Sequence, residues 1–444
     1  MGEQRRVAIV GAGPSGLFTA AALLAQAAEP PAIDIFDRLP TPFGLLRYGV
    51  APDHASIKAV ATTLARVFEA PDVRFLGLVE FGRDVTAAEL RSGYDAVVYA
   101  VGAADDRRLG IPGEDLPGSR SARQFVSWYS GHPDAEAQPL DGVRSAVVVG
   151  VGNVAVDVAR ILLKDPADLS ATDMPDAVLA ELRAARIEDV WLVGRRGPEH
   201  AAFTTPELRE LLETPGIAVT LEGCDLAAID DAGLERHARA NLAAIGRALA
   251  ASPASAPRRL HLLFWHRPAE LAGDGRVRSV RFEPTGGGGA PLTVPAELVL
   301  RSIGYRGVPL PGVPYAEGRI PNLEGRVLEP DGSARPGEYA VGWIKRGPVG
   351  LIGSNKKDAA ETVAALLEDL STLPHREPAD LDALLAARGV RPSTLEDWRR
   401  IDAAEIDRGG LRGRERTKIE AWHELLGLVW GAPSVHRDGD VRPA

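Results

Sequence analysis

Residues 5–16 read RRVAIVGAGPSG, in which a short apolar run leads directly into glycines at positions 11, 13 and 16. The apolar run predicts a buried parallel strand, and the alanine-rich stretch that begins near Ser15 predicts the helix after the turn. Gly11, Gly13 and Gly16 have the spacing of a dinucleotide-binding turn, where a tight bend, close approach of a pyrophosphate and close helix–strand packing each favour glycine. The sequence therefore predicts an α/β fold with a Rossmann-like site near its N-terminus.

The next predicted strand, AIDIFD, ends at Asp37. A carboxylate in this place accepts hydrogen bonds from the adenosine ribose of a dinucleotide. Ser15 lies at the start of the predicted helix, where its backbone or hydroxyl can meet phosphate. The alternative is a glycine turn that serves packing alone, but strand, helix and acid all occur in the order that nucleotide binding requires.

The same pattern returns in the middle of the chain. Residues 144–150, RSAVVVG, form a second apolar run that ends in a glycine. Gly150 and Gly152 are followed by Ala155 in place of the third glycine, a variant that the dinucleotide pattern permits. We therefore expect a second dinucleotide site at this turn.

Two arginines distinguish the second site from the first. The strand predicted after the second turn, DVWLVGRRG, ends in Arg195 and Arg196, where a NAD site would place an acid. Guanidiniums form charge-assisted hydrogen bonds with a 2′-phosphate, so NADP(H) is favoured over NAD(H). A solvated loop is the alternative for an isolated arginine pair.

Two nucleotide sites in one chain are typical of a flavin and a nicotinamide that exchange hydride.

Composition excludes several classes of protein. The chain has 444 residues, which predicts two or three domains, and its only cysteine is Cys224. A single thiol excludes a disulfide reductase with a cysteine pair and an iron–sulfur cluster held by the chain's own thiolates. The formal net charge of −10 argues against nucleic acid as a partner. No apolar run is long enough to span a bilayer, and a glycine turn inside the N-terminal apolar stretch argues against a secretory signal, so we expect a cytoplasmic protein without membrane contact.

Taken in order, the motifs resemble those of the adrenodoxin reductase type of ferredoxin–NADP(+) reductase, bacterial members included. The resemblance runs from the first strand to about Asp369, with a weaker echo in the tail. The motifs that carry it are VAIVGAGPSG, TPFGLLRYGVAPDH, YAVGA, IPGEDLPGS, GVGNVAVDVARILL, VGRRGP with AFTTPELREL, VRSIGYRG, and VGWIKRGPVGLIGSNKKDA.

The resemblance implies which residues form the sites. The FAD contacts would be Ser15, Asp37, Leu45, Val79, Trp343, Gly350, Leu351 and Ile352. The NADPH contacts would be Arg107, Val151, Gly152, Asn153, Val154, Arg195, Arg196 and Glu207, with Gly350 touching the nicotinamide nucleotide as well. His54 and Glu207 would lie near the flavin ring and the nicotinamide and are the candidate catalytic residues.

Some of these residues have simpler interpretations, and some positions depart from the family pattern. Without the resemblance, His54 reads as a structural loop histidine and Trp343 as a core aromatic. Asp37 stands where the family more often has Glu, so the ribose contact must reach further or use water. Residues 345–354, KRGPVGLIGS, form a glycine-rich turn that we call the late glycine loop. Val349 replaces a Thr that is common in this loop.

The late glycine loop also predicts the domain order. Strand, glycine-rich turn and helix appear a third time from Glu338. We predict two Rossmann-like dinucleotide-binding domains with the NADP domain inserted into the FAD domain: residues 1–105 and 331–444 form the FAD domain, including a helical C-terminal tail, and residues 106–330 form the NADP domain.

The expected activity is hydride transfer from NADPH to FAD, followed by transfer of single electrons to a ferredoxin. A flavin monooxygenase, an electron-input subunit of a larger oxidoreductase and a nucleotide sensor without catalysis are the alternatives. A monomer is expected. Because small ferredoxins are usually acidic, a basic docking surface is expected, for which the candidates are Arg183, Arg186, Arg258, Arg259, Lys345 and Arg346.

Overall fold

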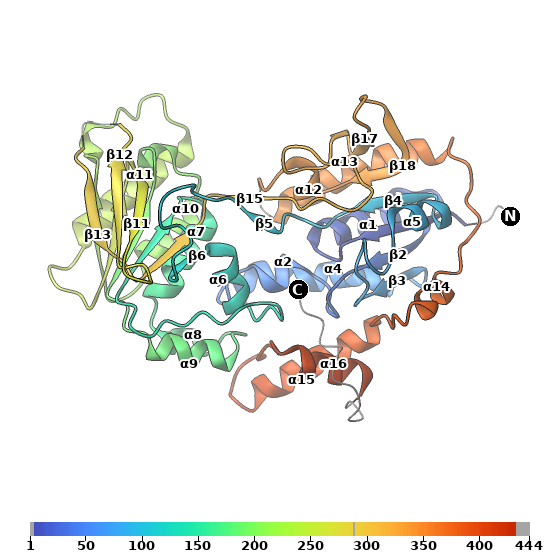
Figure 1. Cartoon of the computed structure of the whole chain (residues 1–444), viewed down its shortest axis with the longest axis horizontal. Coiled ribbons are helices and arrows are strands. Elements are labelled where there is room, and N and C mark those ends of the chain that lie inside the picture. Colours follow the sequence, from blue (N-terminus) through green and yellow to red (C-terminus); the bar gives the residue numbers. More distant parts are fainter. Residues whose placement is uncertain (1–3, 287–288, 351, 432–444) are drawn as a thin grey trace.

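The computed structural model describes residues 4–286, 289–350 and 352–431, which form two lobes (Figure 1). Each lobe is built around its own sheet with helices packed on it, as two Rossmann-like units require. None of the helices in these ranges combines the length and the apolar character needed to cross a membrane.

The first lobe contains a seven-stranded sheet that draws strands from both ends of the described chain. Its order is β16 (Asn322–Leu323), β17 (Arg326–Leu328), β18 (Ala334–Ala340), β4 (Ala96–Tyr99), β1 (Arg6–Val10), β2 (Ala32–Phe36) and β3 (Val73–Leu76). The strands from β18 to β3 run parallel, and β16 and β17 add an antiparallel edge. The FAD domain predicted from separate segments is therefore one sheet in space.

Helices from both ends of the chain cover this sheet. α1 (Pro14–Gln26) and α13 (Ile352–Leu370) pack against each other, and α5 (Ala87–Gly93) lies nearby. The predicted helix over residues 55–70 is divided into α3 (Ala55–Lys58), α4 (Val60–Ala65) and the 3-10 helix η1 (Arg66–Glu69). The short helices α2 (Leu45–Tyr48) and α12 (Trp343–Arg346) stand in the two loops that face the other lobe.

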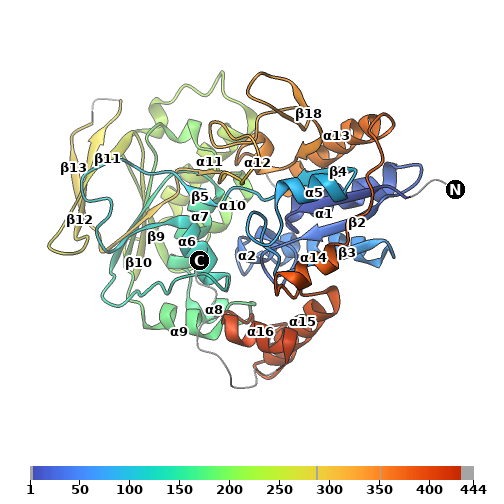
Figure 2. The same cartoon turned by 45° about the vertical axis from the view of Figure 1, so that its right-hand side comes forward.

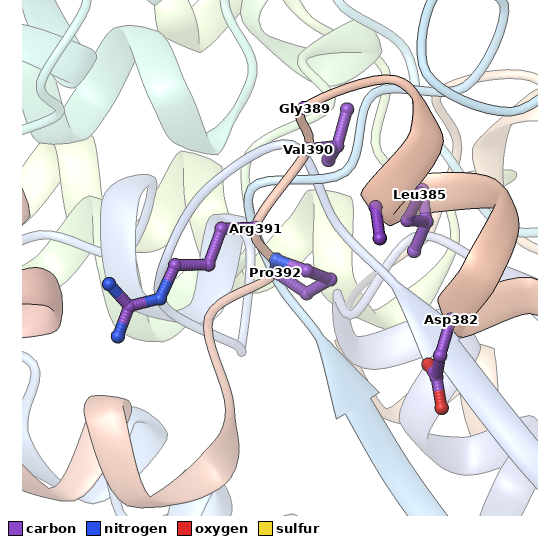
Figure 3. Close-up of a pocket in the computed structure, with 7 residues that line it drawn as sticks. Asp382, Leu385, Gly389, Val390, Arg391 and Pro392 are labelled. Carbon is purple, nitrogen blue, oxygen red and sulfur yellow. The ribbon is translucent and has the colours of Figure 1, made fainter.

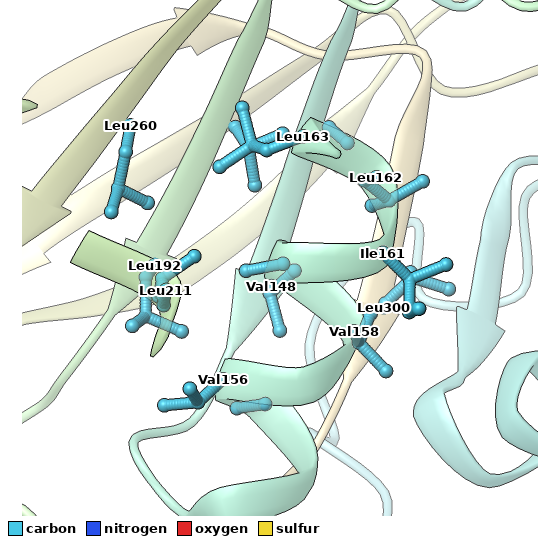
Figure 4. Packing of buried hydrophobic residues seen from close by; sticks show 14 of the residues in the cluster. Val148, Val156, Val158, Ile161, Leu162, Leu163, Leu192, Leu211, Leu260 and Leu300 are labelled. Atoms are coloured by element: carbon cyan, nitrogen blue, oxygen red, sulfur yellow. The ribbon is translucent and has the colours of Figure 1, made fainter. Parts of the chain in front are cut away.

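The second lobe contains a parallel six-stranded sheet. Its order is β6 (Ser119–Ser121), β14 (Leu298–Arg301), β7 (Ser145–Val149), β8 (Asp189–Val193), β10 (Arg258–Leu263) and β9 (Ile217–Glu222). One face is covered by α6 (Ala122–Tyr129), α7 (Asn153–Leu163), α10 (Thr205–Leu212) and α11 (Arg236–Ala251). Figure 4 shows α7 laying Val156, Leu162 and Leu163 onto the sheet residues Val148 and Leu192.

A small antiparallel sheet packs on the other face of the second sheet. It consists of β11 (His266–Ala272), β12 (Ser279–Pro284) and β13 (Leu292–Pro295), and it encloses a core with Val147, Val149 and Val193. The hairpin predicted at residues 286–289 joins β12 to β13, although residues 287 and 288 lie outside the described part of the chain.

Two crossovers join the lobes and pair with each other. β5 (Asp105–Asp106) leaves the first lobe and forms an antiparallel ribbon with β15 (Tyr305–Arg306), which returns to it. The predicted boundary after residue 330 placed β16 and β17 in the middle domain. That placement is wrong, because both strands pair in the first sheet and the chain therefore re-enters the first lobe before residue 322.

The remaining helices lie on the lower side of the molecule in Figure 1. The long crossover predicted between Lys164 and Glu188 contains two short helices, α8 (Pro166–Leu169) and α9 (Asp176–Ala184). The tail forms α14 (Leu381–Ala387), α15 (Leu395–Gly410) and α16 (Trp422–Trp430), as its charged helical pattern predicted.

Candidate functional site

The first glycine turn lies at the carboxyl end of β1 and is closed by tight packing of α1. A Cβ placed on Gly16 would lie 2.0 Å from the carbonyl oxygen of Gly11, so the helix can approach the strand only because residue 16 has no side chain. α1 starts behind Gly13 with no side-chain cap. Its first amide groups are therefore available to an anion at the positive end of the helix dipole.

Asp37 is fixed beside this turn by two backbone amides. Its carboxylate accepts hydrogen bonds from the amides of Ala12 and Leu39, each at 2.9 Å. Burial raises the pKa of Asp37 above its usual value, and the two amide hydrogen bonds oppose that rise. Each carboxylate oxygen can accept more than one hydrogen bond, so the group still has acceptor capacity for ribose hydroxyls.

The late glycine loop returns to the first turn. The Ser15 hydroxyl donates to Asn355 Oδ1 over 3.0 Å, and the amide of Gly342 donates to Asp358 Oδ2 over 2.5 Å. Arg346 ties the same loop to α13 by donating to Asn355 and Asp358 at 2.9 and 2.8 Å. Residues about 340 positions apart therefore form one continuous wall.

The other residues predicted around FAD differ in accessibility. The Leu45 side chain is 42% exposed, whereas Val79 is only 1% exposed and its amide donates to the Asp37 carbonyl over 3.0 Å. Trp343 stacks on Tyr305 with ring centroids 5.8 Å apart. Gly350 is exposed with φ +90°, Ile352 begins α13 half-buried, and Leu351 lies outside the described residues.

The second glycine turn has the same construction. Gly150 has φ +132°, and a Cβ on it would lie 2.1 Å from the carbonyl oxygen of Ser302, so only glycine fits. α7 begins behind Gly152 with no side-chain cap, and a Cβ on Gly152 would meet no atom within 4 Å. The backbone is therefore open to a ligand at the N-terminus of α7.

Neighbouring residues of this turn hold the loop that leads into α10. The Val151 carbonyl accepts from the amide of Ala202 over 2.9 Å, and Asn153 Oδ1 accepts from the amide of Thr204 over 2.7 Å. The oxygen of the Asn153 side chain is thus engaged within the protein, and its amide group remains for a ligand. Val154 is half-buried and packs against the core of the second lobe.

Arg195 and Arg196 follow β8 and project into solvent. Their backbone carbonyls accept hydrogen bonds from Thr285 and Trp265, which fix the loop. Within the described part of the chain, neither guanidinium has an ion-pair partner. Arg107, on the first crossover, is exposed in the same way. These free cations suit a phosphate ligand.

His54 lies where the first lobe meets α7 and α10 of the second. Its Nε2 is 2.8 Å from Glu210 Oε2 and 2.9 Å from Arg160 Nη2. Asp157 approaches the same ring nitrogen to 3.8 Å. Burial raises the pKa of Asp157, while the charge of Arg160 and its hydrogen bond to Asp157 oppose this rise. The contact between the lobes is therefore a network of charged groups.

Asp53 extends this network. It pairs with Arg160, whose side chain is 3% exposed, and with Lys164 at 2.9 Å. Burial alone would raise the pKa of Asp53, but hydrogen bonds and charge from the two cations bring it down to about 2.

The hydrogen-bond partner of His54 on α10 is Glu210, which the sequence analysis did not single out, and Glu207 lies one turn earlier on the same helix. Glu207 Oε2 is buried and has no hydrogen-bond partner in the described part of the chain, which leaves an acceptor free for a ligand. Arg160 and Asp157 were also missed. Their signal was present, because both are charged residues within the otherwise apolar run of α7.

The basic docking residues predicted from the sequence need correction. Lys345 is buried and pairs with Asp358 and Glu361, and Arg346 pairs with Asp358. Arg259 forms a bidentate pair with Asp189, and Arg258 donates to the Leu163 carbonyl. Among the six candidates, Arg183 and Arg186 are exposed and without an ion pair within the described ranges.

A cavity of about 400 Å³ lies elsewhere, between α14 and the loop after it (Figure 3). It is lined by Asp382, Leu385, Ala386, Gly389, Val390, Arg391 and Pro392. None of the predicted nucleotide contacts borders it, so it is not part of the candidate site.

Comparisons with known proteins agree with this geometry. Residues 8–144 match a family model described as FAD-NAD(P)-binding. The chain is 43% identical to the NADPH-ferredoxin reductase FprA of Mycobacterium tuberculosis over 96% of this chain and 99% of that protein. It is 42% identical to human mitochondrial NADPH:adrenodoxin oxidoreductase over 96% of this chain and 92% of that protein. The solved structure of M. tuberculosis FprA in complex with NADPH superposes with a TM-score of 0.90, at 42% identity, over 97% of this chain and all of that one.

Proposed function

This chain belongs to the family of NADPH-ferredoxin and adrenodoxin reductases, and from that membership we propose that it is an oxidoreductase that passes reducing equivalents from NADPH through FAD to a ferredoxin-type iron–sulfur protein. The observation that carries the proposal is the contrast between the two turns. Asp37 stands beside the first, and the guanidiniums of Arg195 and Arg196, which have no ion-pair partner among the described residues, stand beside the second. One lobe thus suits a ribose and the other a 2′-phosphate.

The residues of the first lobe fit FAD. The uncapped start of α1 would hold the pyrophosphate, and Asp37 would hold the adenosine ribose. Leu45, Val79, Trp343 and the turn at residues 350–352 would surround the remainder. Bound FAD accepts two electrons together and releases them singly, which suits a one-electron acceptor. We propose that this domain comprises residues 1–105 and the chain from about residue 322 onward.

The proposed flavin role of Ser15 gives a first prediction. Ser15→Ala removes the hydrogen bond to Asn355, which links α1 to α13, and such a bond contributes about 1 kcal/mol. We expect FAD to bind apoprotein about fivefold more weakly, measured by titration of flavin fluorescence. Thr62→Ala, an exposed change on α4, is the control. Equal FAD affinity in both variants would remove Ser15 from the flavin site.

The residues of the second lobe fit NADPH. The open turn at Gly152 and the free amides of α7 would receive the pyrophosphate, and Arg195 and Arg196 the 2′-phosphate. Arg107 would add charge from the crossover. The partnerless oxygen of Glu207 and the ring of His54 would border the nicotinamide, where they orient it and exclude water.

Glu210 provides a second prediction, because its carboxylate holds His54. Glu210→Gln retains a hydrogen-bond partner but removes the charge, and charge-assisted hydrogen bonds are about twice as strong as neutral ones. We expect flavin reduction by saturating NADPH to slow about three- to tenfold in stopped-flow absorbance. Glu213→Gln, an exposed change at the end of the same helix, should leave the rate unchanged. Equal rates in the two variants would contradict the role of Glu210.

For the electron acceptor, we propose an acidic ferredoxin that approaches the exposed Arg183 and Arg186. Such docking should weaken as salt increases, whereas reduction of a small neutral dye should not. Ferredoxin reduction that does not change with ionic strength would rule out electrostatic steering.

We also propose that the protein acts as a monomer in the cytoplasm, where NADPH is regenerated. Light scattering on the purified protein and cell fractionation test these two points.

One experiment tests the activity as a whole. The purified protein should be yellow, should bleach rapidly with NADPH and much more slowly with NADH, and should reduce cytochrome c only when a ferredoxin is added. Rapid NADPH consumption with oxygen and an organic substrate, but none with ferredoxin, would instead indicate a flavin monooxygenase.

A further inference from the structure

The segment between α15 and α16, residues 411–421, touches both lobes, and we call it the strap. Figures 1 and 2 show α15 and α16 beneath the first lobe, with the chain that joins them turned toward α9 of the second. The strap lies apart from the β5–β15 ribbon through which the chain passes between the lobes. The lobes are therefore tied together at a place where no peptide chain crosses between their sheets.

The strap binds the second lobe through the chain at the start of α9. Arg412 and Arg414 both pair with Asp176, at 2.6 and 3.0 Å. Arg414, which is 8% exposed, also donates to the Met174 carbonyl over 3.2 Å. The amide of Lys418 donates to the Asp173 carbonyl over 3.2 Å. Backbone and side chains thus hold the strap at successive points along residues 173–176.

Lys418 connects the two lobes directly, and its side chain is only 2% exposed. Its ammonium group donates to the Arg47 carbonyl of α2 over 2.5 Å and to the Ser130 carbonyl after α6 over 3.1 Å. It also lies 3.3 Å from Asp173 Oδ2. Burial lowers the pKa of Lys418 to about 7, and in the protonated form its three donors have one acceptor in the first lobe and two in the second.

The groups around Lys418 are fixed by further ion pairs. Asp173 receives Lys58 of α3 at 2.6 Å on both of its oxygens. Arg47 forms a bidentate pair with Glu405 of α15, at 3.0 and 2.5 Å. Glu405 is fully buried, and its carboxylate also accepts from the amide of Ile419 over 2.9 Å. The strap is thereby anchored to the first lobe at Ile419, directly beside the lysine that contacts both lobes.

A ribbon alone between two bodies permits rotation about that ribbon. The Asp53 and His54 network already opposes such a rotation, and the strap adds a further attachment on another side of the lobe contact. We propose that the strap, through Lys418, sets the angle between the lobes and so holds the nicotinamide of NADPH opposite the flavin. Lys418 is then a positioning residue for hydride transfer. This inference rests on the proposed function.

Lys418→Met tests the inference because methionine keeps most of the side-chain length and removes the donors. Displacement of reacting groups by about 1 Å can slow a reaction by up to a hundredfold. In stopped-flow measurements at saturating NADPH, we expect the FAD-loaded variant to bleach at least tenfold more slowly than the wild type. Its Kd for NADP(+) and its FAD content should stay within about threefold, because the nucleotide contacts within each lobe are unchanged.

Hydrogen exchange supplies a readout that does not depend on turnover. In the Lys418→Met protein, the amides of residues 205–212 and 54–58, which are joined by the His54–Glu210 hydrogen bond, should exchange faster. Amides in β1 and β7 should exchange as in the wild type. A side chain that only stabilises the fold would accelerate exchange in the sheets as well and would leave the bleaching rate of the folded protein unchanged.

Asp176→Asn is a second variant. Asp176 lies on α9, where its half-exposed carboxylate receives Arg412 and Arg414 of the strap, so folding is not at risk. It should slow bleaching about threefold. Arg408→Gln is the matched control, because Arg408 pairs with Glu424 inside the tail and touches neither lobe contact. It should match the wild type in rate and exchange.

The inference is overturned if Lys418→Met and Asp176→Asn bleach like the wild type, or if Arg408→Gln slows bleaching as much as they do. Should Lys418→Met fail to fold, the comparison of Asp176→Asn with Arg408→Gln decides alone. Failure of the wild type itself to bleach with NADPH would instead remove the proposed function.

Discussion

Replacing Arg195 and Arg196 together by glutamine should raise the Kd for NADPH by about a hundred- to a thousandfold and leave the Kd for NADH within about threefold. Both guanidiniums are exposed, and neither has an ion-pair partner in the described ranges, so no internal pair competes with a 2′-phosphate for them. A hydrogen bond to a charged group contributes about 1.5–3 kcal/mol, and two of them account for the expected loss. The dependence of flavin bleaching on the concentration of each coenzyme measures the effect.

The control for this prediction is Arg183→Gln, which removes an exposed arginine from the same lobe away from the second glycine turn. It should leave the selectivity for NADPH over NADH unchanged. A double variant that still prefers NADPH as strongly as the wild type would show that another group reads the 2′-phosphate, and Arg107 would be examined next.

Much of the fold was predictable because its decisive features are local in sequence. An apolar run followed by a glycine turn and a helix describes β1 with α1 and β7 with α7, and the structure confirms both. Gly16 lies against the carbonyl oxygen of Gly11 in the same turn, so this glycine requirement is a property of the motif itself. Such short-range constraints appear directly in the residue pattern.

The contacts between the lobes were not predictable in the same way. Glu207 and Glu210 lie on the same helix one turn apart, and the sequence alone does not determine which of them meets His54. Lys345 appeared to be a surface cation, but Asp358 and Glu361 from the following helix enclose it. In both cases the partner of the side chain depends on how a helix is oriented against its neighbour, and sequence periodicity does not specify that orientation.

The tail illustrates the same point over a longer range. Its helices follow from their pattern, yet the pairing of Arg47 with Glu405 joins residues 358 positions apart. Neither residue type nor spacing indicates this partner. The two glycine turns of the candidate sites could therefore be predicted from the sequence, while the connection that fixes one lobe relative to the other could not.

Asp53→Asn should reduce the free energy of unfolding by about 2–3 kcal/mol at pH 7. The carboxylate pairs with the buried Arg160 and with Lys164, and its pKa of about 2 lies below the usual 3.8. A depressed carboxyl pKa stabilises the folded state above the usual pKa, and this stabilisation disappears as the pH falls through the folded value. The shift of nearly two units corresponds to about 2.5 kcal/mol. Urea unfolding at pH 7, 5, 4 and 3 measures it.

The sign of the pH dependence distinguishes this mechanism from a packing defect. The difference in stability between the wild type and Asp53→Asn should be constant from pH 7 to 5, shrink between pH 4 and 3, and vanish near pH 2. Asp382→Asn, which removes one partner of an exposed pair with Arg74, should cost less than about 1 kcal/mol throughout. If the Asp53→Asn difference stays the same at pH 3 as at pH 7, the loss comes from packing. The ion pair between the lobes then does not stabilise their contact.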